Sequence, residues 1–80
     1  MARIRSFRPD PTAARPPRTD VDCTHSIVYT ANGTKLLRLA TLGSDERKSE
    51  PKPSQIIELD EESAAKLLEI IKDTFPRLRS

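Results

Sequence analysis

In SQIIELDEESAAKLLEII, residues 54–71, the apolar pattern changes period in the middle, which indicates a strand followed directly by a helix. Residues 54–59 alternate between two faces, and a period of two is that of a β-strand. Pro53 stands at the start of this strand, where a missing N–H is tolerated. From Asp60 onward, apolar side chains recur at helical spacing, which predicts an amphipathic helix packed on the strands. The apolar side of the helix carries Ala64, Leu67, Leu68, Ile71 and Phe75.

Both ends of this helix have chemical signals. Asp60 is a good N-cap residue, and Glu61 and Glu62 lie in the first turn, where the helix dipole favours carboxylates. Pro76 ends the helix, because proline has no backbone N–H to continue it. The remaining side is charged, so we expect it to face water. It carries Glu62, Lys66, Glu69 and Asp73.

Upstream, the pattern predicts a β-hairpin. A run from Val21 rich in Thr, Ile, Val and Tyr ends at Asn32-Gly33, and residues 34–42 are again typical of a strand. Asn-Gly tolerates the positive φ angles of tight hairpin turns. The loop length is open. A two-residue turn pairs Tyr29 with Leu36, whereas a three-residue turn with a glycine bulge pairs Tyr29 with Lys35, and this one-residue difference exchanges the two faces.

The two hairpin strands distribute their apolar side chains differently. On the first strand, the alternate face that contains Ile27 is the more apolar one, so we expect this face to be buried. It carries Cys23, His25, Ile27 and Tyr29. The second strand has leucine on both faces, which indicates a strand covered by the helix on one side and by a partner chain on the other. Leu36 and Leu42 share one face, and Leu37 and Leu39 share the other.

The remaining segments bound the domain. Residues 43–53, GSDERKSEPKP, contain turn formers and charges and are expected to be a solvated loop. Residues 1–20 hold four of the seven prolines and five arginines, which predicts an extended arm that is mobile when alone. We therefore expect an α+β chain with an arm over 1–20, a βββα domain over 21–76 and a tail over 77–80. A body of about 56 residues is only marginally stable by itself, which favours a homodimer.

Composition excludes several classes of protein. The single cysteine, Cys23, cannot form an intrachain disulfide, so a reducing, cytoplasmic location is expected. No apolar run is long enough for a bilayer, so we expect no membrane contact. Cys23 and His25 supply only two zinc ligands, and the two glycines lie too far apart for a phosphate loop. We therefore expect no metal, no cofactor and no enzymatic activity.

The layout of two segments resembles a known family. SQIIELDEESAAKLLEII and, upstream, NGTKLLRLATLGSDERKSEPKP are similar to the last strands and C-terminal helix of the positive-cofactor-four family of single-stranded-DNA-binding transcription cofactors. The resemblance covers about residues 34–75. It implies a twisted antiparallel sheet followed by one helix, and binding of single-stranded nucleic acid. It also implies that inward positions are taken by Gln55, Ile57 and Leu59 on the strand and by Leu67, Leu68 and Ile71 on the helix.

For function, the sequence offers two hypotheses of different classes. The first is a small nucleic-acid-binding protein of low sequence specificity, a possible transcription or replication cofactor, which neutralises phosphates with a basic arm and surface and stacks bases on Tyr29. Its candidate contact residues are Arg3, Arg5, Arg8, Arg15, Arg18, Tyr29, Lys35, Arg38, Arg47, Lys48 and Lys52. The alternative is a protein-interaction accessory, such as an inhibitor, antitoxin or regulatory subunit. It would dock through its arm and a sheet face containing Leu36 or Leu42, and an exposed apolar patch there would favour it.

Overall fold

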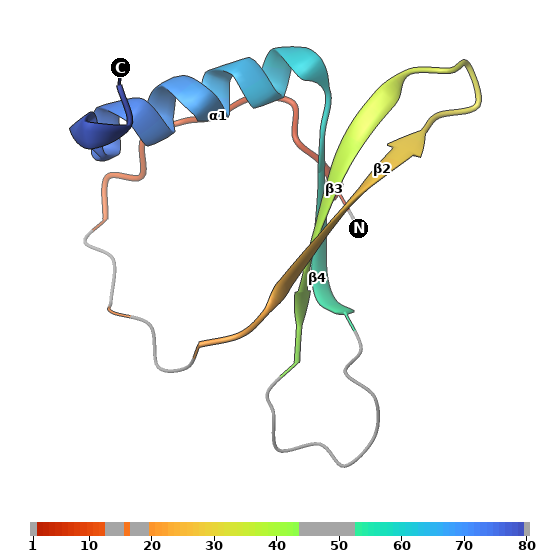
Figure 1. Ribbon diagram of the computed structural model, residues 1–80, viewed down its shortest axis with the longest axis horizontal. Helices are drawn as coiled ribbons and strands as arrows, with labels where there is room; N and C mark the ends of the chain where they lie inside the picture. The colour runs from red at the N-terminus through yellow and green to blue at the C-terminus, as the bar shows by residue number, and fades with distance from the viewer. Residues whose placement is uncertain (1, 13–15, 17–19, 44–52, 80) are drawn as a thin grey trace.

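A computed structural model shows a four-stranded mixed sheet that continues into one long helix (Figure 1). It describes residues 2–12, 16, 20–43 and 53–79. The predicted α+β class is therefore confirmed. Along the chain the elements are β1 (Ala2–Arg3), β2 (Cys23–Tyr29), β3 (Lys35–Leu42), β4 (Pro53–Leu59), α1 (Glu61–Thr74) and a short 3-10 helix, η1 (Pro76–Leu78). Across the sheet the order is β1-β4-β3-β2.

The hairpin adopts the three-residue alternative. Tyr29 pairs with Lys35, and the backbone N–H of Thr30 donates to the carbonyl of Thr34 at 2.9 Å, which leaves three residues in the loop. Gly33 has a φ of 87°, in the left-handed region where a side chain would be strained. The glycine therefore fixes both the loop length and the faces of the two strands.

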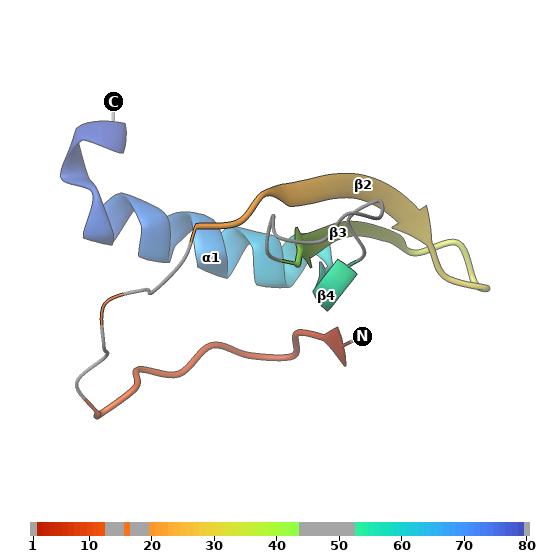
Figure 2. The same ribbon diagram turned by 90° about the horizontal axis from the view of Figure 1, so that it is seen from below.

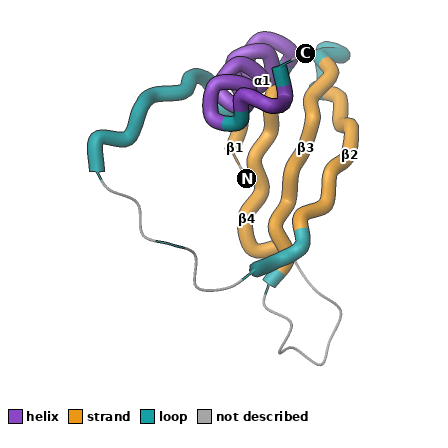
Figure 3. The backbone as a smooth tube through the Cα atoms, turned by 60° about the vertical axis from the view of Figure 1, so that its left-hand side comes forward, coloured by secondary structure: helices purple, strands orange, loops and turns teal. Residues whose placement is uncertain are grey.

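The first residues of the arm form a strand that the sequence did not predict. Ala2 and Arg3 pair in parallel with Ile57 and Glu58 of β4, and the Ile4 N–H donates to the Glu58 carbonyl at 2.8 Å. These bonds satisfy backbone groups at the outer edge of β4. The expected three-stranded sheet thus has a short fourth strand, visible beside β4 in Figure 3. Residues 13–15 and 17–19 of the predicted arm and residues 44–52 of the predicted loop lie outside the described residues.

The helix begins and ends as predicted. The Asp60 side chain accepts a hydrogen bond from the Ser63 backbone N–H at 2.8 Å, and α1 stops at Thr74, two residues before Pro76. Ser63 is buried, and its Oγ donates to the Ile4 carbonyl at 2.9 Å. This serine therefore fastens the start of the helix to the N-terminal segment.

The core of the described chain is small, because the helix leaves the sheet instead of lying across it. From the end of β4, α1 runs away to one side and leaves β2 uncovered (Figures 1 and 2). Among the described apolar residues, only Leu36, Ala40 and Leu59 are buried. The predicted burial of one β2 face is wrong in the single chain, because none of the described helices and strands covers it. Its four residues, Cys23, His25, Ile27 and Tyr29, are all exposed.

Candidate interaction surface

One face of the sheet gathers apolar side chains from three strands, most of them exposed. The pairing aligns them in two rows. In the first row, Ile27 lies opposite Leu37, which lies opposite Leu59. In the second row, Leu39 lies between His25 and Ile57. We call Ile27, Tyr29, Leu37, Leu39 and Ile57 together the apolar face.

The apolar face is much more exposed than the reverse side of β3. The exposed fraction is 59% for Ile27 and 37% for Ile57, whereas Leu36 on the reverse side is 5% exposed. Of the β3 leucines, Leu37 and Leu39 therefore belong to the more exposed face and Leu36 to the buried one. The family resemblance implied that Gln55, Ile57 and Leu59 occupy inward positions. Leu59 is buried, but Gln55 and Ile57 are exposed.

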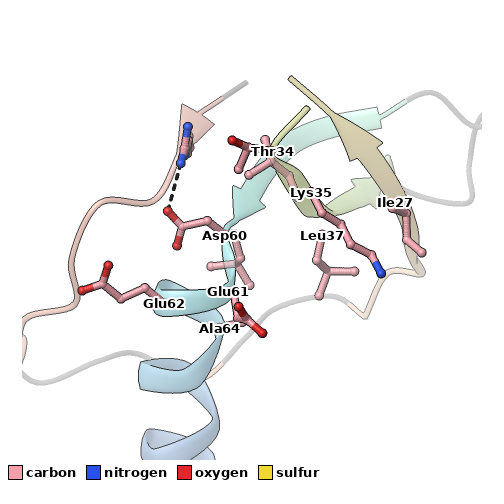
Figure 4. Close-up of a pocket in the computed structure, with 11 residues that line it drawn as sticks. Ile27, Thr34, Lys35, Leu37, Asp60, Glu61, Glu62 and Ala64 are labelled. Carbon is pink, nitrogen blue, oxygen red and sulfur yellow. Dashed lines mark hydrogen bonds and ion pairs between the residues drawn. The ribbon is translucent and has the colours of Figure 1, made fainter. Parts of the chain in front are cut away.

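A hollow of about 610 Å³ lies at the end of the apolar face, where β4 turns into α1. Ile27 and Leu37 point toward the side on which the helix begins, and the hollow is lined by both of them together with Leu59 and Ala64 (Figure 4). The lining also contains two cationic residues and three acidic residues: Arg3, Lys35, Asp60, Glu61 and Glu62. A partner side chain that enters here would meet an apolar floor with opposite charges beside it.

The apolar surface continues from the hollow along the helix. Leu68 lies one helical turn after Ala64 and therefore on the same side of α1. Leu68 is 50% exposed and Phe75 is 58% exposed, while Leu67 and Ile71 are half-buried. The predicted apolar stripe of the helix is thus only partly covered by its own chain.

The predicted nucleic-acid-binding residues that the structure describes lie on different surfaces. Tyr29 and Lys35 lie directly opposite each other at the hairpin end of the apolar face, and the Tyr29 side chain is 65% exposed. The remaining described members of the set are Arg3, Arg5, Arg8 and Arg38. Outside the described residues lie Arg15, Arg18, Arg47, Lys48 and Lys52.

Two of these arginines are held by carboxylates. The Nη2 atom of Arg38 lies 2.8 Å from the Glu58 carboxylate, whose side chain is only 12% exposed. Arg3 pairs with Asp60 at 3.0 Å (Figure 4). A phosphate would have to compete with these carboxylates, which reduces what either arginine could contribute to nucleic-acid binding.

Arg5 and Arg8 lie along the charged side of the helix. The first described part of the arm passes beside α1 (Figure 2). A groove of about 790 Å³ is lined by residues 5–9 on one side and by α1 on the other. The arm side of the groove includes both arginines and Phe7, which is half-buried. The helix side includes Glu62, Lys66, Glu69, Ile70 and Asp73. The basic arm thus faces an acidic helix surface of its own chain, and the helix side predicted to be solvated is in part the wall of this groove.

Asp60 is expected to make folding sensitive to acid. Its hydrogen bond from the Ser63 N–H, followed by the Arg3 guanidinium, holds the pKa of its carboxyl below the ordinary value of 3.8. A carboxyl whose pKa is lowered by folding stabilises the folded state above its unfolded pKa, and this contribution is lost as pH falls through the folded pKa. Asp60→Ala should therefore lower the melting temperature at pH 7 but have little effect near pH 2. The melting temperatures would be measured by circular dichroism, with Asp73→Ala as the control. An equal decrease in the melting temperature of Asp60→Ala at both pH values would contradict this expectation.

Comparisons with protein-family models, curated proteins and solved structures found no match for this chain. The resemblance to the positive-cofactor-four family therefore stays a prediction. Within the described ranges, no helix is long and apolar enough to cross a membrane. Those same ranges contain no group of three or more His, Cys, Asp or Glu side chains that could hold a metal ion.

Proposed function

We propose that this chain is a non-enzymatic protein-interaction accessory that binds a partner protein through the apolar face. The observation that carries the proposal is the alignment of exposed Ile27, Leu37 and Ile57 in adjacent rows of one sheet face. Contiguous apolar surface of this kind marks interaction sites in soluble proteins. The sequence predicted a docking face that contains Leu36 or Leu42, but the apolar face contains Leu37 and Leu39. The three-residue turn sets which leucines share a face with Ile27 and Tyr29.

The size of the core supports the same conclusion. A chain with only three buried apolar side chains in its described part stabilises its sheet weakly, and covering the apolar face would add to that stability. Each half-exposed aliphatic side chain that becomes buried contributes about 1 kcal/mol. A partner on the apolar face would therefore stabilise the fold as it binds, which is the behaviour expected of an inhibitor, antitoxin or regulatory subunit.

Single-stranded nucleic acid is the second candidate, and Tyr29 favours it. This exposed ring lies next to the cationic Lys35, and together they could stack one base and neutralise one phosphate. Among the side chains of the two rows beside them, only His25 can hydrogen-bond, and the others are aliphatic, so the rows offer little with which to bind further nucleotides. The same face therefore fits a protein surface better than an extended strand of nucleic acid.

The proposal predicts that a partner is lost when the apolar face is made polar. Leu37→Thr/Ile57→Thr in the tagged full chain should abolish co-purification of a stoichiometric partner protein from cells of the source organism. Thr is a good strand former, so circular dichroism should show that the variant folds. The matched control, Val21→Thr/Leu78→Thr, replaces two exposed apolar residues that belong to none of the strands and should retain the partner.

Two results would contradict the proposal. One is a partner that co-purifies in equal amount with Leu37→Thr/Ile57→Thr and with Val21→Thr/Leu78→Thr. The other is binding of the purified chain to a labelled single-stranded oligonucleotide that weakens steeply between 50 mM and 200 mM salt and is lost in Tyr29→Ala/Lys35→Ala. A steep salt dependence would show that phosphate neutralisation dominates the binding, and the nucleic-acid candidate would then replace the protein-interaction proposal.

A further inference from the structure

The outer edge of β2 is an unprotected strand edge. β2 lies at one end of the sheet, and no described strand pairs with its other side. Its sequence, CTHSIVY, contains no Asp, Glu, Lys, Arg or Pro, and its pairing with β3 is regular over all seven residues. Natural sheets usually protect such edges with charges, prolines or bulges. The absence of charges, prolines and bulges from β2 indicates that this edge pairs with another strand.

The hydrogen bonds to β3 show which backbone groups of β2 are available. The Leu42 N–H donates to the Asp22 carbonyl, and Thr30 donates to Thr34, so the even-numbered residues of this strand bond toward β3. In an antiparallel ladder the alternate residues point the other way. The free N–H and C=O groups therefore belong to Cys23, His25, Ile27 and Tyr29.

We propose that a second copy of this chain adds its own β2 to this edge, antiparallel, about a two-fold axis at Ser26. His25 then lies opposite Ile27 of the second copy, and Cys23 lies opposite Tyr29 of the second copy. Each residue whose N–H and C=O groups point away from β3 then lies opposite such a residue of the second copy, so each of these pairs exchanges two hydrogen bonds. The arrangement is isologous and closed, as most homodimers are.

The sequence of β2 is self-complementary in this register. Thr24 lies opposite Val28 of the second copy, and just outside the strand Asp22 lies opposite Thr30 of the second copy, so no like charges meet. A slip by one residue would place outward-pointing groups against residues already bonded to β3. The two-fold register also keeps both apolar faces on the same side of the joined sheet, where they form one larger surface.

Dimerisation through β2 is independent of the proposed function, because the edge would pair through backbone groups whereas the apolar face would bind a partner through side chains. A chain that dimerises through β2 without a protein partner on its face would refute the proposed function alone. A monomer that binds a partner through the face would refute the dimer alone. The two failures are thus distinguishable.

A cysteine at the two-fold axis tests the register. In Cys23→Ser/Ser26→Cys, each new thiol faces its counterpart at a position that does not hydrogen-bond across the interface, where Cα atoms are about 4.5 Å apart, within the range for a disulfide. We expect the full chain to form a disulfide-linked dimer under mild oxidation. The matched control is Cys23→Ser/Thr24→Cys, whose thiol faces Val28 of the second copy and should cross-link at least about 10-fold more slowly.

A proline on the free edge tests the interface in the reduced protein. His25→Pro removes an outward N–H and leaves the bonds to β3 in place, so the folded monomer should persist. Sedimentation equilibrium should give a dimer dissociation constant about 100-fold higher than that of the unaltered chain, since one hydrogen bond donated by each copy across the interface is lost. The inference is overturned if the unaltered chain stays monomeric at millimolar concentration. It is also overturned if both cysteine variants cross-link equally fast, or if His25→Pro leaves the dissociation constant unchanged.

Discussion

Leu59→Ala is expected to destabilise the folded chain by about 2–5 kcal/mol, the range for truncating a buried leucine. Leu59 is 2% exposed, the lowest value among the described apolar residues. It lies at the end of β4, opposite Leu37, and lines the hollow beside the first turn of α1. Because the described core has only two other buried apolar residues, a large share of the stability should depend on this side chain. Urea unfolding followed by circular dichroism at 222 nm would measure the loss.

Leu78→Ala is the control for this prediction. Leu78 is 57% exposed on η1, so the same chemical change should alter the free energy of unfolding by no more than about 0.5 kcal/mol. Equal losses in the two variants would show that Leu59 is not the centre of the core. A large loss for Leu78→Ala alone would place the principal packing at the C-terminal end of the helix instead.

Arg38→Ala is expected to cost about 2 kcal/mol, because it leaves the mostly buried Glu58 carboxylate without its guanidinium. The Nε and Nη2 atoms of Arg38 both donate to one oxygen of Glu58, at 3.0 and 2.8 Å. The pair joins β3 to β4 at directly opposed positions. Arg3→Ala should cost less, because the Arg3–Asp60 pair is more exposed to water, which screens it.

A double-mutant cycle isolates the pair. Arg38→Thr/Glu58→Thr removes both charges and keeps good strand formers, so most of the loss seen in Arg38→Ala should be recovered. Chemical denaturation of the two single Thr variants and the double variant should give a coupling free energy of about 1–2 kcal/mol. A coupling near zero would mean that the ion pair is incidental to the stability of the sheet.

Local signals in the sequence were sufficient to predict most of the fold. Asp60 as the N-cap, the strand before it and the proline after the helix are all confirmed, because each depends on neighbouring residues. The hairpin was predicted but its register was not, since both turn lengths satisfy Asn32-Gly33 locally. The pairing of Tyr29 with Lys35 decided it. β1 was missed because a strand of two residues has no periodicity to recognise.

Burial was the part that the sequence could not determine. Strand alternation shows that Ile27 and Tyr29 share a face, but it does not show whether any element covers that face. Because of the angle at which α1 leaves β4, the helix does not cover this face of β2 (Figure 1). The ion pairs were equally hidden, because Arg3 and Asp60 are 57 positions apart and Arg38 and Glu58 are 20 apart. Counting cations in the sequence therefore could not show that Arg3 and Arg38 are paired with carboxylates.

In-cell photocrosslinking would identify what contacts the apolar face. The photoreactive residue p-benzoylphenylalanine would replace Ile57, which is far from the β2 edge across the sheet, with Asn32 in the exposed hairpin loop as the control position. After irradiation of living cells, mass spectrometry would identify the adduct. The account predicts a discrete protein adduct at position 57 that is missing at position 32. A nucleic-acid adduct at position 57, or no adduct beyond that of the control, would contradict it.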